Sequence, residues 1–355
     1  MVKIMVVGAS GSLGQLICKE IIRIFDKPFE LIVTDYKETR GELFASSLKH
    51  KYTFFKKLDI NNEEEIHKTI VNLDLVIVAI EQKHPMVQEK CIEKQIMCID
   101  VTPYQPFVDM VLMLNSKCEN NQVASIVMSG FLPGLSGLMI KEGIRGFQEV
   151  EEVNLGFLQS TNAKVGVTGI VDMLSIVSGP VDLNNQIIKG FSFKKRMQFY
   201  KKDKQSNVRL IHHAEQKHLK ENLKINNLRY WTAWDQLIFN KAISLFNKTG
   251  FINFITQAQY KHTLSKFVKH NPRKSKNAYL TVEIKGKSNN VKHSKLLQLV
   301  TPSDYYTTAM ITAALSNILL KHNLSGARFP FQITNLDNIL RTIKSDKIQL
   351  NIRDI

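Results

Sequence analysis

The hydrophobic pattern at the start of the chain changes from a continuous run to a helical period. Residues 2–7 form a short, nearly continuous apolar run, as in a strand that is buried on both faces. Residues 15–22 then carry apolar side chains at helical spacing. Between the two stands Gly8-Ala9-Ser10-Gly11-Ser12-Leu13-Gly14. This pattern predicts a buried strand, a glycine turn and a helix.

The glycine turn suggests a phosphate site. Gly8 and Gly11 have no Cβ atom, so the turn can be tight and a ligand can approach the backbone closely. The first amides of the following helix lack an internal acceptor and, with the helix dipole, suit a pyrophosphate. Gly14 would permit close packing of the helix on the strand. The spacing differs from the usual G-x-G-x-x-G, and a loop of this kind can also be only a tight turn.

The second apolar run, residues 29–35, ends in an acid. Asp35 follows the last glycine by about twenty residues, where a dinucleotide fold places the carboxylate that accepts from ribose hydroxyls. Such a carboxylate repels a 2′-phosphate, so NAD is favoured. Lys37 and Arg40 would offset that repulsion, so NADP stays open. The alternative for Asp35 is a solvated acid at a strand end.

Further apolar runs continue the alternation of strands and helices. The four later strands are expected at residues 52–60, 73–80, 95–100 and 122–128. Helices are expected between them at residues 37–48, 84–94 and 107–118. Six strands that alternate with helices predict an α/β fold with an N-terminal, doubly wound parallel sheet of the Rossmann type.

The cofactor contacts are expected where these strands end, because open parallel sheets bind ligands at their carboxyl edge. Asp59 and Ile60 should lie beside the adenine, although Asp59 could equally cap the next helix. The residues predicted to bind the cofactor are Gly8, Ser10, Gly11, Ser12, Leu13, Asp35, Tyr36, Asp59, Ile60, Ala79, Ile80 and Thr102.

A family resemblance becomes visible at the glycine-rich bend Gly130-Phe131-Leu132-Pro133-Gly134-Leu135. With this bend, the chain resembles the saccharopine dehydrogenase-like oxidoreductases of the saccharopine reductase type. The other matching stretches are residues 8–14, 34–35, 74–80, 100–103 and 304–314, the last after a predicted hairpin around Lys285-Gly286-Lys287.

The resemblance implies three parts and an activity. Residues 1–134 would form the dinucleotide-binding domain, residues 135–300 a second α/β domain with a mixed sheet for substrate and dimer contacts, and residues 301–355 a segment that returns to the first domain. It also implies a homodimer that oxidises or reduces a carbon–nitrogen bond of an amino-acid or polyamine derivative.

The middle of the chain departs from the family. Residues 159–169 stand where the family tends to have a glycine-rich substrate segment, so its substrate ligands do not transfer by position. Strands are expected here at residues 151–158, 187–200, 208–212 and 279–285, and helices at 234–247 and 257–269. Trp231, Trp234, Phe239 and Phe246 resemble a stripe that faces the core.

Charge is concentrated in the same region. Of the net charge of +16, residues 191–300 hold 23 Lys and Arg against 5 Asp and Glu, so the rest of the chain is nearly neutral. This asymmetry points to an anionic substrate, a nucleic acid or a membrane surface, or to a solvated lysine-rich face. Arg209 and Arg229 suit bidentate pairing with substrate carboxylates, or are solvent-exposed.

No residue identifies itself as the catalytic acid or base. Tyr104, Lys164 and His84 are the candidates, and each has a structural alternative. His212, His213 and His218 do not have metal-site spacing, so no metal is predicted.

The four cysteines form no C-x-x-C pair and predict reduced core thiols in a cytoplasmic protein. No run of eighteen apolar residues or signal peptide is found, so no membrane partner is expected.

These observations predict an NAD(P)-dependent oxidoreductase that acts on an amino-acid-derived, anionic substrate. Two rivals remain. The absence of a convincing acid–base residue favours a sensor or scaffold that binds the dinucleotide without turnover. The basic region favours a protein that binds nucleic acid.

Overall fold

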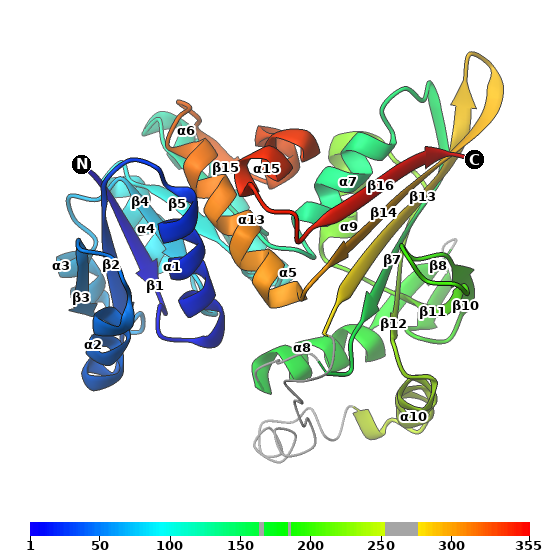
Figure 1. The fold of residues 1–355 in the computed structure, drawn as a ribbon, viewed down its shortest axis with the longest axis horizontal. Coiled ribbons are helices and arrows are strands. Elements are labelled where there is room, and N and C mark those ends of the chain that lie inside the picture. The colour runs from blue at the N-terminus through cyan, green and yellow to red at the C-terminus, as the bar shows by residue number, and fades with distance from the viewer. Residues whose placement is uncertain (163–166, 184–185, 253–275) are drawn as a thin grey trace. The chain divides into compact units, whose positions relative to one another are not determined.

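The computed structural model describes residues 1–162, 167–183, 186–252 and 276–355 (Figure 1). The chain divides into two compact units. The first consists of Met1–Leu138 and Tyr305–Ser345, and the second of Met139–Asp304 and Asp346–Ile355.

The first unit is built on a seven-stranded parallel sheet with the order β15-β6-β5-β4-β1-β2-β3. Its strands are β1 (Val2–Val7), β2 (Phe29–Asp35), β3 (Thr53–Lys57), β4 (Leu75–Val78), β5 (Met97–Asp100), β6 (Ala124–Ile126) and β15 (Gly326–Arg328). The strand order reverses between β1 and β4, which is the point where open α/β sheets bind ligands. The predicted doubly wound sheet is confirmed.

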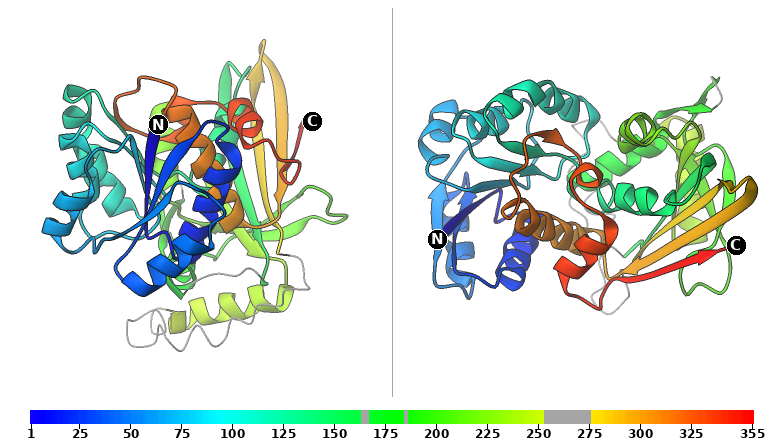
Figure 2. Two further views of the ribbon diagram at one scale, coloured as in Figure 1. Left: turned by 60° about the vertical axis from the view of Figure 1, so that its left-hand side comes forward. Right: turned by 90° about the horizontal axis from the view of Figure 1, so that it is seen from above.

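Helices cover both faces of this sheet (Figure 2, right). They are α1 (Ser12–Ile24), α2 (Glu38–Ser47), α3 (Glu63–Thr69), α4 (Met86–Glu93), α5 (Gln105–Met113), α6 (Asn115–Asn120), α13 (Asp304–Leu319), α14 (Pro330–Ile333) and α15 (Leu336–Ile343). On the face covered by α3 and α4, a core cluster joins Met5, Val7 and Val76 of the sheet to Ile66 and Val87 of the helices. Because both faces are covered, the central strand β4 is apolar and buried at every position.

The second unit contains a mixed sheet of seven strands with the order β10-β11-β12-β7-β13-β14-β16. The strands are β7 (Glu149–Gln159), β10 (Lys194–Met197), β11 (Ser206–Ile211), β12 (Leu228–Trp234), β13 (Ala278–Ser288), β14 (Val291–Thr301) and β16 (Gln349–Asp354). Only β12 and β7 pair in parallel; the other pairs are antiparallel. The predicted α/β unit with a mixed sheet is confirmed.

The remaining elements of the chain lie around this second sheet. β8 (Pro180–Leu183) and β9 (Gln186–Lys189) form a separate two-stranded sheet. The helices are α7 (Leu135–Gly143), which crosses the boundary between the units, α8 (Val167–Ser178), α9 (Glu215–Leu223) and α10 (Leu237–Lys248).

Several sequence predictions in the second unit are wrong in detail. The strand expected at residues 187–200 is interrupted, and its parts are β9 and β10. The hairpin turns at Asn289-Asn290, both with positive φ (49° and 60°), and not at Gly286. Gly286 lies inside β13 at a register shift, where a Cβ would come within 2.1 Å of the Glu149 carbonyl oxygen. The helix expected at residues 257–269 lies outside the described residues.

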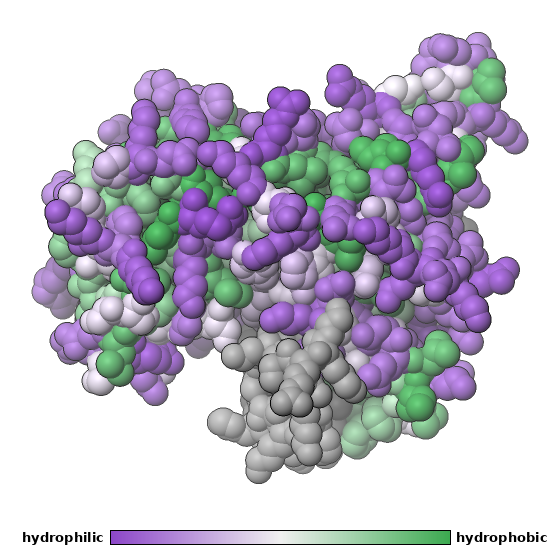
Figure 3. Space-filling view, in the orientation of Figure 1, coloured by the Kyte–Doolittle hydropathy of each residue, from purple (hydrophilic) through white to green (hydrophobic). Residues whose placement is uncertain are grey.

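The predicted aromatic stripe is divided between two elements. Trp231 and Trp234 belong to β12 and are buried, whereas Phe239 and Phe246 on α10 are each 39% exposed. α10 also exposes Leu237 and other apolar side chains, at the lower right of Figure 3. The prediction of core packing is therefore wrong for the two phenylalanines.

The C-terminal part of the chain contributes to both units. Residues 305–345 lie in the first unit, where β15 pairs with β6. β16 instead pairs with β14 of the second sheet. Among the described residues, no helix is long and apolar enough to cross a membrane.

Candidate cofactor site

The glycine turn after β1 is shaped so that side chains do not fit. Gly8 has a φ of +76°, and a Cβ there would lie 2.2 Å from Cγ2 of Ile80. The amide of Gly11 donates to the Gly8 carbonyl oxygen at 3.0 Å. A Cβ on Gly14 would lie 2.2 Å from the same oxygen. Each glycine of the predicted motif is thus constrained by a close backbone or side-chain approach.

The turn leads directly into the N-terminus of α1. Gly11 is the N-cap in extended conformation, with no side-chain cap and no acid in the first helical turn. The first amides of α1 therefore remain available to an external acceptor, and the helix dipole favours an anion there. Ser12 is exposed at this end, and Leu13 is half-buried. These residues fit the pyrophosphate of a dinucleotide.

The carboxylate of Asp35, at the end of β2, already accepts several hydrogen bonds within the protein. Asp35 is 3% exposed, and its carboxylate accepts from the Ser10 hydroxyl and from the Lys37 amide at 2.8 Å. Arg40 Nη2 lies 2.8 Å from both carboxylate oxygens, and Arg40 Nε donates at 3.0 Å. The hydrogen bond to Asp35 raises the pKa of Arg40. The alternative of a solvated acid is therefore wrong, and the charge of Asp35 is neutralised.

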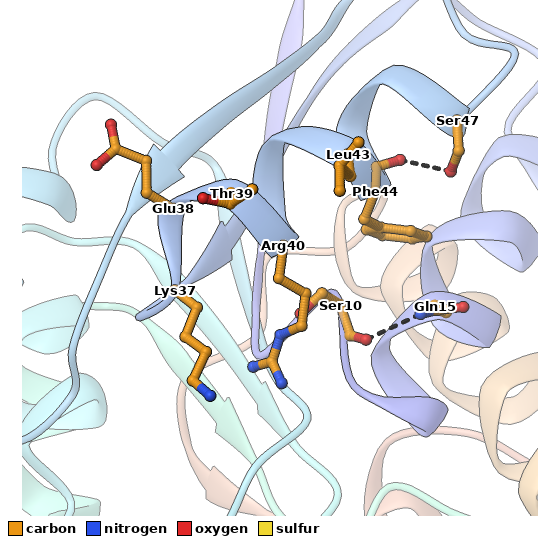
Figure 4. Close-up of a pocket in the computed structure, with 9 residues that line it drawn as sticks. All are labelled: Ser10, Gln15, Lys37, Glu38, Thr39, Arg40, Leu43, Phe44 and Ser47. Carbon is orange, nitrogen blue, oxygen red and sulfur yellow. Dashed lines mark hydrogen bonds between the residues drawn. The ribbon is translucent and has the colours of Figure 1, made fainter.

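A cavity of about 730 Å³ lies beside this ion pair (Figure 4). Its lining residues are Ser10, Gln15, Lys37, Glu38, Thr39, Arg40, Leu43, Phe44 and Ser47. Arg40 extends toward Ser10 in the figure, whereas Glu38 points away from it. The exposed ring of Tyr36 lies 5.5 Å from Lys37 Nζ and 5.4 Å from Arg40 Cζ. The cavity therefore offers two cations next to an aromatic face.

The structure at the end of β3 tests the prediction that Asp59 caps the next helix. Asp59 and Ile60 are half-buried, and Asp59 Oδ1 accepts from the Asn61 amide at 2.9 Å. The N-cap of α3 is Asn62, whose side chain accepts from the amides of Glu64 and Glu65. Asp59 thus shapes the turn before α3 and is not its cap.

A buried carboxyl group lies at the ends of β4 and β5. Asp100 is 0% exposed, and it accepts from Gln88 Nε2 at 2.7 Å, Gln82 Nε2 at 3.1 Å and the Thr102 amide at 2.7 Å. Burial raises the pKa of Asp100 to about 6, and the hydrogen bonds from Thr102 oppose this shift. Thr102 is buried, while Ala79 and Ile80 are half-buried.

Asp100 was not predicted as a site residue, although its sequence signal matches that of Asp35. Each is an acid that ends an apolar strand. The signal could have been used for both positions.

The bend Gly130–Leu135 is held by the C-terminal stretch that shares the family resemblance. The Phe131 amide donates to Thr308 Oγ1 at 3.1 Å, and Thr312 Oγ1 donates to the Ser129 carbonyl oxygen at 2.8 Å. Gly134 has a φ of +122°. The first residues of α13 therefore fix the bend after β6.

Of the three predicted catalytic candidates, the structure describes Tyr104 and His84, and both side chains are exposed. Tyr104 is 56% exposed at the start of α5, and His84 is exposed before α4. Lys164 lies outside the described residues.

The two predicted carboxylate binders already have partners. Arg209 donates to the Phe191 carbonyl oxygen at 3.1 Å and stacks on its ring, and burial lowers the pKa of Arg209. Arg229 Nη1 lies 3.4 Å from Glu152. Neither is a solvent-exposed cation, because both are half-buried.

His213 of the second unit has a structural role. His213 is buried and stacks on Tyr230 with ring centroids 5.0 Å apart. Burial lowers the pKa of His213 to about 3. Within the described ranges, no group of three or more His, Cys, Asp or Glu residues could hold a metal.

Comparison with known proteins gives one family match. Residues 4–126 match the family described as the saccharopine dehydrogenase NADP binding domain. The resemblance noted in the sequence is thereby confirmed, and the chain is an NAD(P)-dependent dehydrogenase with a nicotinamide dinucleotide as its cofactor. A search of curated proteins finds no match.

A solved structure with a TM-score of 0.50 extends the likeness in fold to both units. An engineered D-amino acid dehydrogenase bound to NADP⁺ has 12% identity and a TM-score of 0.50, with 96% of this chain and 98% of that chain covered. A DAP dehydrogenase of C. glutamicum in complex with DAP has 11% identity and a TM-score of 0.49, with the same coverage. An oxidoreductase of Agrobacterium radiobacter with NAD⁺, L-tartaric acid and magnesium has 11% identity, a TM-score of 0.47, and coverage of 96% and 93%.

Proposed function

We propose that this dehydrogenase uses NADP(H) to oxidise or reduce a carbon–nitrogen bond of an amino-acid-derived, anionic substrate. The observation that carries the proposal is the glycine turn at the switch point between β1 and β4, with the uncapped amides of α1 behind it. The match to the saccharopine dehydrogenase NADP binding domain supports the same coenzyme class.

The coenzyme supplies or accepts a hydride when it is bound. The residues of this chain would divide the rest of the work between the two halves of the sheet. The amides of Ser12 and Leu13 would bind the pyrophosphate, and the groups around Tyr36 and Asp59 would hold the adenosine. Ala79, Ile80 and Thr102 would orient the nicotinamide half at the ends of β4 and β5.

The preference for NADP(H) rests on the pair of Asp35 and Arg40. From the sequence, Asp35 favours NAD because a free carboxylate repels a 2′-phosphate. In the structure this carboxylate is neutralised by Arg40, whose side chain is still 49% exposed beside the cavity. Arg40 and Lys37 can then donate to a 2′-phosphate, a charge-assisted contact that NAD cannot make.

Two mutations test this preference. Arg40→Leu should lower NADPH affinity about tenfold or more, since hydrogen bonds to charged groups contribute about 1.5–3 kcal/mol. The affinity for NADH should stay the same or rise, because Asp35 becomes free to accept from the ribose. Lys37→Ala is the comparison variant. It removes the other cation of the cavity without freeing Asp35, so it should weaken NADPH binding but should not improve NADH binding. Equal weakening of both coenzymes in Arg40→Leu would contradict the proposal.

The substrate class is supported by the basic residues 191–300 and by the family's chemistry. It can be tested by following NADPH oxidation with a panel of 2-oxo acids combined with amino acids or polyamines. We expect turnover with at least one pair whose product carries a carboxylate. Tight NADPH binding without turnover across the panel, and without oxidation of the matching conjugates, would favour a coenzyme sensor.

We also propose a cytoplasmic homodimer. The free cysteines Cys18, Cys91, Cys98 and Cys118 are all buried, which suits a reducing compartment. Light scattering should give twice the chain mass of 40.6 kDa. A monomer at all concentrations would remove the dimer from the proposal without affecting the coenzyme site.

A further inference from the structure

The carboxyl group of Asp100 is buried, and no cation from the described parts of the chain pairs with it. Its side chain is 0% exposed, and the groups that determine its pKa are its own burial and uncharged donors from Thr102, Gln88 and Gln82. Buried carboxylates are usually paired with a cation or coordinate a metal, because an unpaired buried charge is costly. Four uncharged donor groups, two of them from Thr102, form hydrogen bonds to this one carboxyl group. The function of this arrangement requires an explanation.

The cluster joins two loops at the coenzyme edge of the sheet. Gln82 lies in the loop between β4 and α4, and Thr102 lies in the loop between β5 and α5. Gln82 also accepts from the Val87 amide at 3.4 Å, and its Nε2 donates to Gln88 at 3.0 Å. Asp100 therefore ties both loops together. In a doubly wound sheet, the β4–β6 half receives the second nucleotide, which here carries the nicotinamide.

The two oxidation states of that nucleotide differ in charge. The nicotinamide ring is a cation when oxidised and neutral when reduced. An anion fixed nearby in a low-dielectric environment attracts only the oxidised ring. A buried charge acts more strongly than an exposed one, since water and salt screen it less.

We propose that Asp100 is an electrostatic positioning residue that favours the oxidised over the reduced coenzyme, with Gln82, Gln88 and Thr102 holding its carboxyl group in the ionised form. The inference rests on the proposed coenzyme site. It goes beyond that site because Asp100 is not among the predicted coenzyme contacts. The inference gives this residue a role in setting the relative affinity for the oxidised and reduced coenzyme.

Other titratable groups near Asp100 do not supply this charge. The thiol of Cys98, two residues earlier on β5, interacts electrostatically with Asp100 and forms a hydrogen bond with Cys91 of α4. That hydrogen bond and burial raise the pKa of Cys98 well above its ordinary value, so this thiol is neutral at physiological pH. After β6, the backbone amide of Ser129 donates to the backbone carbonyl oxygen of Asp100 at 3.1 Å, and it brings no charge to the carboxyl group.

The charge also predicts a pH dependence. Because the pKa of Asp100 is about 6, its carboxyl group is ionised at pH 8 and largely protonated at pH 5. The preference for the oxidised coenzyme should therefore be present at pH 8 and fade as the pH falls through 6.

The test is calorimetry of NADP⁺ and NADPH binding to the full chain at pH 8. Asp100→Asn should weaken NADP⁺ roughly three- to tenfold, as expected for the loss of one charge interaction, and leave NADPH unchanged or tighter. Asp59→Asn is the matched control. It also alters an acid at a strand end, but on the adenosine half, so it should affect both oxidation states equally.

Two further measurements keep the test decisive if Asp100→Asn does not fold. In the wild type, the NADP⁺ to NADPH affinity ratio should fall between pH 8 and pH 5. In Gln88→Met, which lacks one donor to the carboxylate, the same fall should occur at higher pH.

Three outcomes are distinguishable. A ratio that does not change with pH in the wild type, or equal effects of Asp100→Asn on both forms, would overturn the inference. Failure of the folded wild type to bind either form would instead overturn the proposed coenzyme site.

Discussion

Replacing Asp100 by Asn should change how the stability of the first unit depends on pH. Burial raises the pKa of Asp100 from 3.8 to about 6. Each unit of pKa difference between the folded and unfolded states corresponds to about 1.4 kcal/mol, so the shift corresponds to about 3 kcal/mol. Asn has a similar shape and no proton to gain or lose in this range.

The sign of the effect follows from the direction of the shift. A pKa that is higher in the folded state means that folding favours the protonated form. The contribution of Asp100 to stability is therefore fully present below about pH 4 and is lost as the pH rises through 6. Relative to Asp100→Asn, the wild type should lose about 3 kcal/mol of stability between pH 4 and pH 8.

The measurement must report on the first unit alone. Both tryptophans, Trp231 and Trp234, lie in β12 of the second unit. Hydrogen exchange of the amides in β4 and β5, followed by mass spectrometry at increasing urea, gives the local unfolding free energy. Tryptophan fluorescence during the same unfolding series serves as the control and should not distinguish the two proteins.

The pH series decides the result. If the difference between wild type and Asp100→Asn is the same at pH 5 and pH 8, the pKa of Asp100 is not raised in the folded state. The hydrogen bonds from Gln82, Gln88 and Thr102 would then fully compensate the carboxylate for its lost hydration. The argument that burial raises the pKa of Asp100 would be refuted.

Three other predictions concern different parts of the chain. Gly14→Ala should reduce dinucleotide affinity at least about tenfold in calorimetry, because its Cβ would meet the Gly8 carbonyl oxygen at 2.2 Å; unchanged affinity would show that the turn is misread. Tyr230→Phe removes the 2.9 Å hydrogen bond to buried Glu215 and should cost about 1–3 kcal/mol in urea unfolding followed by tryptophan fluorescence. A cost near zero would mean that Glu215 needs no such donor. Burial raises the pKa of Cys118 to about 11, so iodoacetamide at pH 8 should modify it only after unfolding, as judged by mass spectrometry. Modification of the native protein would contradict this.

The first sheet could be predicted from the sequence because its central strands are largely buried on both faces. Runs such as residues 75–78 are apolar at every position, and the helices between them have their own period. β15 was missed because Gly326–Arg328 is a three-residue strand with no repeating pattern. It is a strand because β6 offers it a partner, and a pairing so distant along the chain leaves no local signal.

The second unit was less predictable because some of its strands, such as β9 and β10, are short and mostly exposed, and because its turns use unexpected residues. Asn289-Asn290 makes the β13–β14 turn with two positive φ angles, a conformation that Asn tolerates and that matches the twist of a hairpin. The sequence predicts the hairpin turn at Gly286 because glycine is a commoner turn residue than asparagine. The actual requirement for glycine at this position is the close approach of the Glu149 carbonyl oxygen on the neighbouring strand.

Asp35 and Asp100 show what sequence pattern leaves undetermined at the site. Both end an apolar strand of the same parallel sheet, and both are buried. Asp35 pairs with Arg40, five residues later, and its charge is neutralised where a 2′-phosphate would bind. Among the described residues, Asp100 receives only uncharged donors, and it would keep its charge in the half of the sheet proposed to receive the nicotinamide. Identical signals thus lead to opposite electrostatics, because the partner of each carboxylate comes from the helix or loop that follows the strand. In the proposed site, the adenosine half would thereby be prepared for an added negative charge, and the nicotinamide half for a positive one.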